Sequence, residues 1–130
     1  MKTFIGIDLG STTTKAIVID EERNVLGRGI TNSRSNYDTA AAIAKQEALV
    51  SARFQLFRNA LSRAKVLNGG LEDFIAQLER DFRLEQFLEQ LDDLEATCRR
   101  NAETGKFGDA AKAVSAALQE VFRLLKEEAP

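Results

Sequence analysis

The pattern of apolar and polar positions changes near residue 35. Before it, the chain shows short runs of β-forming residues that are separated by polar or glycine-containing breaks; after it, apolar residues recur at intervals of three and four. The first pattern is typical of strands and the second of amphipathic helices. The sequence therefore predicts an α+β protein with a sheet region at residues 1–34 and a helical region at residues 35–130.

Three strands are expected in the first region. They cover residues 2–8, 13–20 and 25–31, with a polar turn at residues 21–24. Connections this short favour an antiparallel meander. Gly27 and Gly29 either weaken the third strand or mark a place where another backbone approaches it closely. A sheet this small needs a helix or a partner against one face to be stable in water.

The second region predicts about four helices that close a small bundle. The first follows a serine-x-x-acid capping signal at Ser35 and Asp38 and ends near residue 67, before Gly69 and Gly70. Its apolar stripe comprises Ile43, Val50, Phe54, Phe57 and Leu61. Further helices are expected at residues 71–80, 84–101 and 109–127, with a loop at residues 103–108.

Side chains on these helices have ordinary structural explanations. Cys98 is interpreted as a small apolar residue of the bundle rather than a reactive thiol. Glu89, Asp92 and Asp93 are interpreted as part of a solvated helix face, with a divalent-cation site as the alternative.

Composition narrows the classes of function. The chain has 130 residues, a net charge of −2 and a pI near 5.3, which does not favour a nucleic-acid or membrane-surface partner. One cysteine and no histidine exclude an internal disulfide and a conventional Cys/His zinc site. The N-terminal apolar run is too short and too polar for a signal or a membrane span, so a cytoplasmic location is expected.

The stretch that suggests chemistry is IGIDLGSTTTK, residues 5–15. Gly10 can take a positive φ and leaves room for a ligand, so that the amides of residues 11–13 can cradle phosphate oxygens, with Lys15 adding charge. Asp8 suits magnesium held through water. The same residues also fit an ordinary hairpin turn with a solvated lysine. A Walker loop and a dinucleotide fingerprint are excluded, because position 14 is threonine and a strand follows the glycine.

Residues 5–15 resemble the first phosphate loop of the superfamily of acetate kinases, sugar kinases, heat-shock chaperones and actin. The run IVIDEERNVLGRGITNSRSNYDTA, residues 17–40, is similar to the start of the activator ATPases of 2-hydroxyacyl-CoA dehydratases and the ATPase subunits of benzoyl-CoA reductase. The continuation AKQEALVSARFQLFRNAL, residues 44–61, looks most like the larger ATPase-type subunit of benzoyl-CoA reductase.

This resemblance implies an actin-like ATPase lobe in which ATP hydrolysis by water drives low-potential electrons from a [4Fe–4S] cluster into a partner subunit that reduces benzoyl-CoA. Asp8 would then lie near magnesium-bound water, and Gly10 would let phosphate approach. The residues implied to contact ATP phosphates are Ser11, Thr12, Thr13, Thr14 and Lys15. The resemblance implies no catalytic side chain here and no cluster on this chain.

The superfamily clamps its nucleotide between two lobes, and the sequence shows only one phosphate loop. The chain is therefore expected to be an N-terminal piece of a larger subunit, and its activity alone stays open. Two alternatives remain. The helical region can be a non-catalytic docking module for other reductase subunits, or the loop can belong to a sugar-kinase or acetate-kinase type of enzyme.

Overall fold

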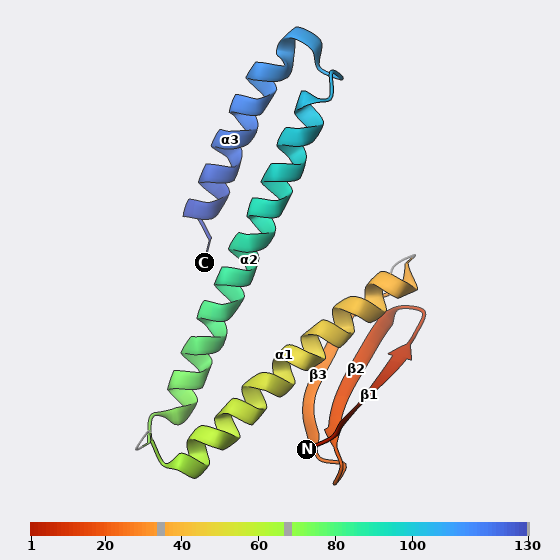
Figure 1. Cartoon of the computed structure of the whole chain (residues 1–130), viewed down its shortest axis with the longest axis vertical. Helices are drawn as coiled ribbons and strands as arrows, with labels where there is room; N and C mark the ends of the chain where they lie inside the picture. Colours follow the sequence, from red (N-terminus) through yellow and green to blue (C-terminus); the bar gives the residue numbers. More distant parts are fainter. Residues whose placement is uncertain (34–35, 67–68, 130) are drawn as a thin grey trace. The chain divides into compact units, whose positions relative to one another are not determined.

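The computed structural model describes residues 1–33, 36–66 and 69–129 (Figure 1). Its elements, in chain order, are β1 (Thr3–Leu9), β2 (Thr13–Asp20), β3 (Val25–Asn32), α1 (Tyr37–Ala64), α2 (Leu71–Glu103), the short 3-10 helix η1 (Gly108–Ala110) and α3 (Ala111–Glu127). They form two compact units, Met1–Ile75 and Ala76–Pro130. The predicted α+β class is confirmed. Whether residues 35–130 act as an insertion in an ATPase lobe stays a prediction.

The sheet of the first unit is the expected antiparallel meander, with strand order β1-β2-β3. Each predicted strand lies within one residue of the observed bounds. A register shift between Val18 and Ile19 marks a bulge in the β2–β3 pairing. The turn after β2 is fastened by Asp20, whose carboxylate accepts hydrogen bonds from the amides of Glu22 and Asn24 and from the Asn24 side chain.

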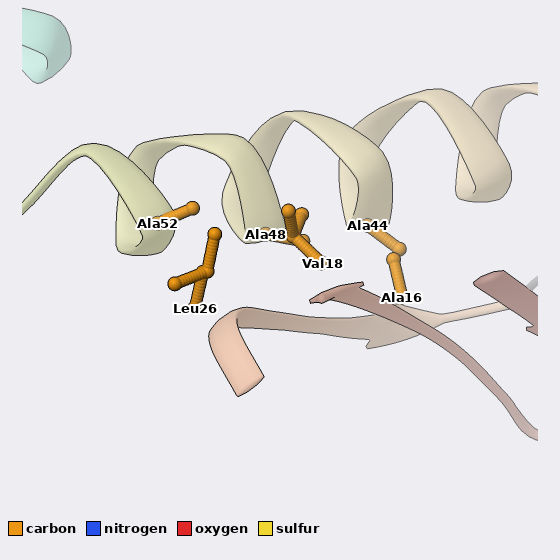
Figure 2. Packing of buried hydrophobic residues seen from close by; sticks show 6 residues of the cluster. All are labelled: Ala16, Val18, Leu26, Ala44, Ala48 and Ala52. Carbon is orange, nitrogen blue, oxygen red and sulfur yellow. The ribbon is translucent and has the colours of Figure 1, made fainter. Parts of the chain in front are cut away.

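Helix α1 covers one face of this sheet, over β2 and β3 (Figure 1). Figure 2 shows the contact, in which alanines of the helix meet small and branched side chains of the strands. The cluster comprises Ala16, Val18, Leu26, Ala44, Ala48 and Ala52. A Cβ added at Gly27 would collide with the Ala48 carbonyl oxygen, and one at Gly29 with that of Ala44. The two glycines thus mark a close approach of helix and strand backbones.

The buried face of α1 matches the predicted stripe only in part, since Val50 is buried as expected. Ile43 and Phe57, expected on the apolar stripe, are 46% and 42% exposed. The residues that α1 buries are Ala40, Ala44, Ala48, Val50 and Ala52. The prediction was wrong at Ile43 and Phe57 because it favoured large apolar residues, whereas a helix lying directly on strand glycines needs small side chains on its inner face.

The ends of α1 also differ from the prediction. Asn36 is the N-cap, since its side-chain oxygen accepts the Thr39 amide at 3.0 Å. The predicted cap Ser35 and the predicted end at residue 67 lie outside the described residues. The helix ends at Ala64, where Lys65 adopts a left-handed conformation with φ of 52°.

The second unit contains most of α2 together with α3, and here the expected number of helices was wrong. The helices predicted at residues 71–80 and 84–101 are one continuous helix, so the described residues contain three α-helices instead of about four. Residues 81–83 include neither glycine nor proline, so nothing in the sequence interrupts the backbone hydrogen bonds there. The last helix begins at Ala111, two residues later than predicted, behind η1.

Lys126 of α3 contacts two carboxylates of α2. Its ammonium group contacts Asp92 at 2.6 Å and Glu95 at 2.7 Å, and these carboxylates raise the pKa of Lys126, Asp92 having the larger effect. Asp92 therefore takes part in a contact between α2 and α3. Cys98, also on α2, is half-buried.

In the part of the chain that the structure describes, no helix combines the length and the apolar character needed to cross a bilayer.

Candidate functional site

The turn between β1 and β2 contains the residues that the sequence identified. It is closed by the Gly10 amide, which donates to the Thr13 carbonyl oxygen at 3.1 Å. The expectation of a positive φ at Gly10 is wrong, since the positive-φ glycines of the described chain are all at other positions. Glycine is required for another reason: a Cβ at this position would lie 2.7 Å from the Thr13 carbonyl oxygen.

Ser33, which directly follows β3, forms hydrogen bonds to this turn from the interior of the protein. Its amide donates to the Thr12 carbonyl oxygen at 3.0 Å, and its hydroxyl donates to the Gly10 carbonyl oxygen at 2.6 Å. The same hydroxyl lies 2.9 Å from the Thr14 hydroxyl, and both side chains are fully buried. The carbonyl groups of Gly10, Thr12 and Thr13 are thus all engaged inside the protein.

Unlike these carbonyl groups, the amides at the tip of the turn have no hydrogen-bond partner among the described residues. Within residues 1–33, 36–66 and 69–129, no hydrogen-bond acceptor pairs with the amide of Ser11 or Thr12, and both residues are exposed. Successive unpaired N–H groups in a turn form a concavity that binds anions. The turn therefore combines inward carbonyls with available amides, which is the arrangement a phosphate group requires.

Asp8 and Lys15 flank this turn on the face of the sheet away from α1. They are partners in the β1–β2 register, and neither forms an ion pair among the described residues. On β2 the exposed Lys15 lies between the buried Thr14 and Ala16, so it points away from the helix. Arg28 of β3 is exposed on the same face.

A groove of about 740 Å³ lies along this region of the sheet. Its lining comprises Gly6, Ile7, Asp8, Lys15, Ala16, Ile17, Arg28, Gly29, Ile30 and Glu47. Two cationic and two anionic side chains therefore border a floor made of strand backbone and isoleucines. Such a surface can accept a polar ligand at its charged rim and an apolar group on its floor.

Residues 5–129 match the family described as the BadF/BadG/BcrA/BcrD ATPase family, which is nearly the whole chain. The chain belongs to this ATPase family. The resemblance stated from residues 5–61 is thereby confirmed, and ATP is the ligand that the family description names. No curated protein and no solved structure matches the chain.

The predicted ATP contacts of this family member separate into two groups in the structure. Ser11, Thr12 and Lys15 are exposed at or near the turn, and Thr13 is half-buried at the start of β2. Thr14 differs, because its side chain is 0% exposed and its hydroxyl binds Ser33. A phosphate contact by the Thr14 hydroxyl is therefore not supported, and this side chain instead braces the turn from inside.

Asp8 is the residue that the sequence predicts near magnesium-bound water. The described residues contain no cluster of three acidic, cysteine or histidine side chains that would enclose an ion. A single exposed carboxylate at a strand end fits magnesium all the same, because this ion keeps several waters and binds through one or two carboxylates.

Sequence reasoning missed two residues of the site. For Arg28 a usable signal existed, because successive side chains of a strand point to opposite faces. Arg28 therefore lies on the face of β3 opposite to the glycines that face α1. Ser33 gave no such signal. Its role depends on the β2–β3 register, which brings residue 33 beside residues separated from it by about twenty positions.

Proposed function

We propose that this chain supplies one half of an ATP site, with the turn after β1 receiving the phosphate groups. The observation that carries the proposal is the orientation of the peptide groups: three carbonyls of the turn are engaged internally, and the Ser11 and Thr12 amides have no partner among the described residues. Because the chain belongs to an ATPase family, we infer that the phosphate compound is ATP.

In this proposal the turn binds by charge and hydrogen bonding and supplies no nucleophile. The Ser11 and Thr12 amides, with the nearby hydroxyls of residues 11–13, donate to phosphate oxygens. Lys15 adds positive charge beside them. Preorganised donors of this kind stabilise the charge that shifts between phosphate oxygens during hydrolysis by water. Asp8 would hold magnesium through water, and the ion would neutralise part of the phosphate charge when bound.

A second protein segment has to complete the site. Ser11 and Thr12 are exposed, and the adjacent groove is open to solvent. An open site of this kind leaves phosphate in contact with water, where each hydrogen bond contributes little. We therefore infer that closure over the turn by another lobe is needed for tight binding and hydrolysis.

The wider role proposed for the assembled subunit is ATP-driven transfer of low-potential electrons for the reduction of benzoyl-CoA or a related aromatic acyl-CoA. The [4Fe–4S] cluster would be held elsewhere in the assembly, because Cys98 is the chain's single cysteine and such clusters use about four thiolates. The support for this role is the similarity of residues 17–61 to reductase ATPase subunits.

The proposal is tested by nuclear magnetic resonance on the chain with MgATP at millimolar concentration. We expect the amide signals of Ser11 and Thr12 to shift on titration, and Lys15→Ala to reduce the apparent affinity about fivefold to tenfold, as expected for loss of a charge-assisted contact. Lys112→Ala, an exposed lysine of α3, is the matched control. Shifts confined to other regions, or an unchanged affinity in Lys15→Ala, would refute phosphate binding at the turn.

A second candidate function is subunit docking through the second unit. Large apolar side chains remain exposed there at helical spacing: Phe87 and Leu94 on α2, and Val121 and Leu125 on α3. Exposed apolar stripes of this kind mark interaction surfaces. Leu94→Lys and Val121→Lys should abolish co-purification with the reductase subunits while leaving the MgATP-induced shifts unchanged. Retained co-purification of both variants would exclude this surface.

A further inference from the structure

We infer that Ser33 is a positioning residue for the phosphate-binding turn, an inference that rests on the proposed ATP site. Ser33 lies behind the turn and has no exposed surface. Through its amide and its hydroxyl it binds two carbonyl groups of the turn, those of Thr12 and Gly10. It therefore fixes which way the Gly10–Ser11 and Thr12–Thr13 peptide groups face without touching the ligand itself.

The direction of these hydrogen bonds follows from the number of protons available. The Ser33 hydroxyl has one proton, which it donates to the Gly10 carbonyl oxygen at 2.6 Å. The 2.9 Å contact with Thr14 must then run from the Thr14 hydroxyl to the Ser33 oxygen. The result is a directed chain, from Thr14 to Ser33 to Gly10, in which each bond polarises the next.

This chain matters for phosphate binding because a peptide group presents either its N–H or its C=O to a ligand. If the Gly10 carbonyl rotated outward, the Ser11 amide joined to it would rotate inward, and an oxygen would face the phosphate. The Ser33 hydroxyl opposes that rotation, and the Ser33 amide opposes the corresponding rotation of the Thr12–Thr13 peptide group. The turn is then already ordered before the ligand binds, so the free-energy cost of ordering it does not weaken the affinity.

The burial of the pair also indicates a specific role. Two hydroxyl groups without solvent contact destabilise a protein unless both are hydrogen-bonded. Here both are satisfied only while the Gly10 carbonyl faces inward. A valine and alanine pair would fill the same space without that requirement, so packing alone does not explain the hydroxyls.

The experiment compares Ser33→Ala, Thr14→Val and the control Ser51→Ala in the complete chain. Ser51 is a half-buried serine of α1 that lies outside the turn. Two quantities are measured: amide hydrogen exchange of Gly10 to Thr12 without ligand, and the apparent affinity for MgATP from the titration of the same signals.

Ser33→Ala should speed exchange of the Gly10 amide about tenfold and weaken MgATP binding about fivefold to tenfold, because one short hydrogen bond in a turn contributes on the order of 1 kcal/mol. Thr14→Val, which keeps the Ser33–Gly10 bond, should give a smaller change in the same direction. Ser51→Ala should leave both quantities unchanged even if it lowers thermal stability. A response of this kind separates positioning of the turn from a general loss of stability.

A folded Ser33→Ala protein with unchanged turn exchange and unchanged MgATP affinity would overturn the inference. If Ser33→Ala fails to fold, Thr14→Val decides: equal exchange in Thr14→Val and Ser51→Ala would overturn it as well. If the unaltered chain shows no response to MgATP, the proposed function fails, whereas the exchange measured without ligand still tests whether Ser33 holds the turn.

Discussion

Replacing Gly29 with alanine tests the contact on which the first unit depends. Gly29 lies in β3 under α1, and a Cβ there would meet the Ala44 carbonyl oxygen, the Ala48 nitrogen at 2.7 Å and the Glu47 Cβ at 2.8 Å. Two of these three atoms belong to the helix backbone, so no side-chain rotation can make room. The helix has to move away from the sheet, or the strand has to bend.

The size of the effect follows from the overlap. The Ala48 nitrogen is closer than the 3.4 Å at which ordinary contact begins, and the Ala44 carbonyl oxygen is closer still. Overpacking costs about 1 to 3 kcal/mol and the rigid backbone favours the upper end, whereas the gain from a stiffer unfolded chain is only about 0.4 to 1 kcal/mol. A net loss of about 2 kcal/mol should lower the melting temperature of a unit of this size by about 10 °C.

Tyrosine fluorescence offers an assay confined to the relevant unit. Tyr37 is the only tyrosine, the chain has no tryptophan, and this residue begins α1. Gly6→Ala is the matched control, because a Cβ at Gly6 meets only Ile17, at an ordinary 3.5 Å. The control should melt within about 2 °C of the unaltered chain, as surface changes usually do. Equal melting of Gly29→Ala and Gly6→Ala would show that helix and strand do not approach as described.

Two further predictions concern local hydrogen bonds. Asn36→Ala should cost about 1 kcal/mol of unfolding free energy by removing the cap of α1, whereas Asn36→Asp should retain it, and urea titration of Tyr37 fluorescence distinguishes the two; equal losses would exclude this cap. The Asn24 side chain, opposed by burial and aided by nearby amides, holds the pKa of Asp20 below its ordinary 3.8. The folded state therefore binds this proton less readily than the unfolded state, so the stabilisation is present above pH 4 and is lost as the pH falls through the lowered value. Asp20→Asn should reduce this acid sensitivity, and an unchanged pH profile would contradict the assignment.

Much of the candidate site was predictable because its chemistry is local. Asp8, Gly10 and Lys15 sit within eight residues, and the hydroxyl-rich turn between two apolar runs was visible in the pattern. The reason for Gly10 was not visible, since it is a collision with a carbonyl oxygen and not a positive φ. The orientation of Thr14 was equally inaccessible, because both faces of a strand look alike until a helix covers one of them.

The sequence by itself determined the three strands, the meander, the helical character of the region after them and membership in an ATPase family, because each of these depends on neighbouring residues or on a motif. Only the tertiary structure decided that α1 packs through its alanines and that Ser33 holds the turn. Those features depend on how closely two backbones approach and on which residues strand pairing brings together. The periodicity of a single segment contains neither the distance between two backbones nor the pairing of distant residues. Both are set only when the strands pair and the helix packs on the sheet.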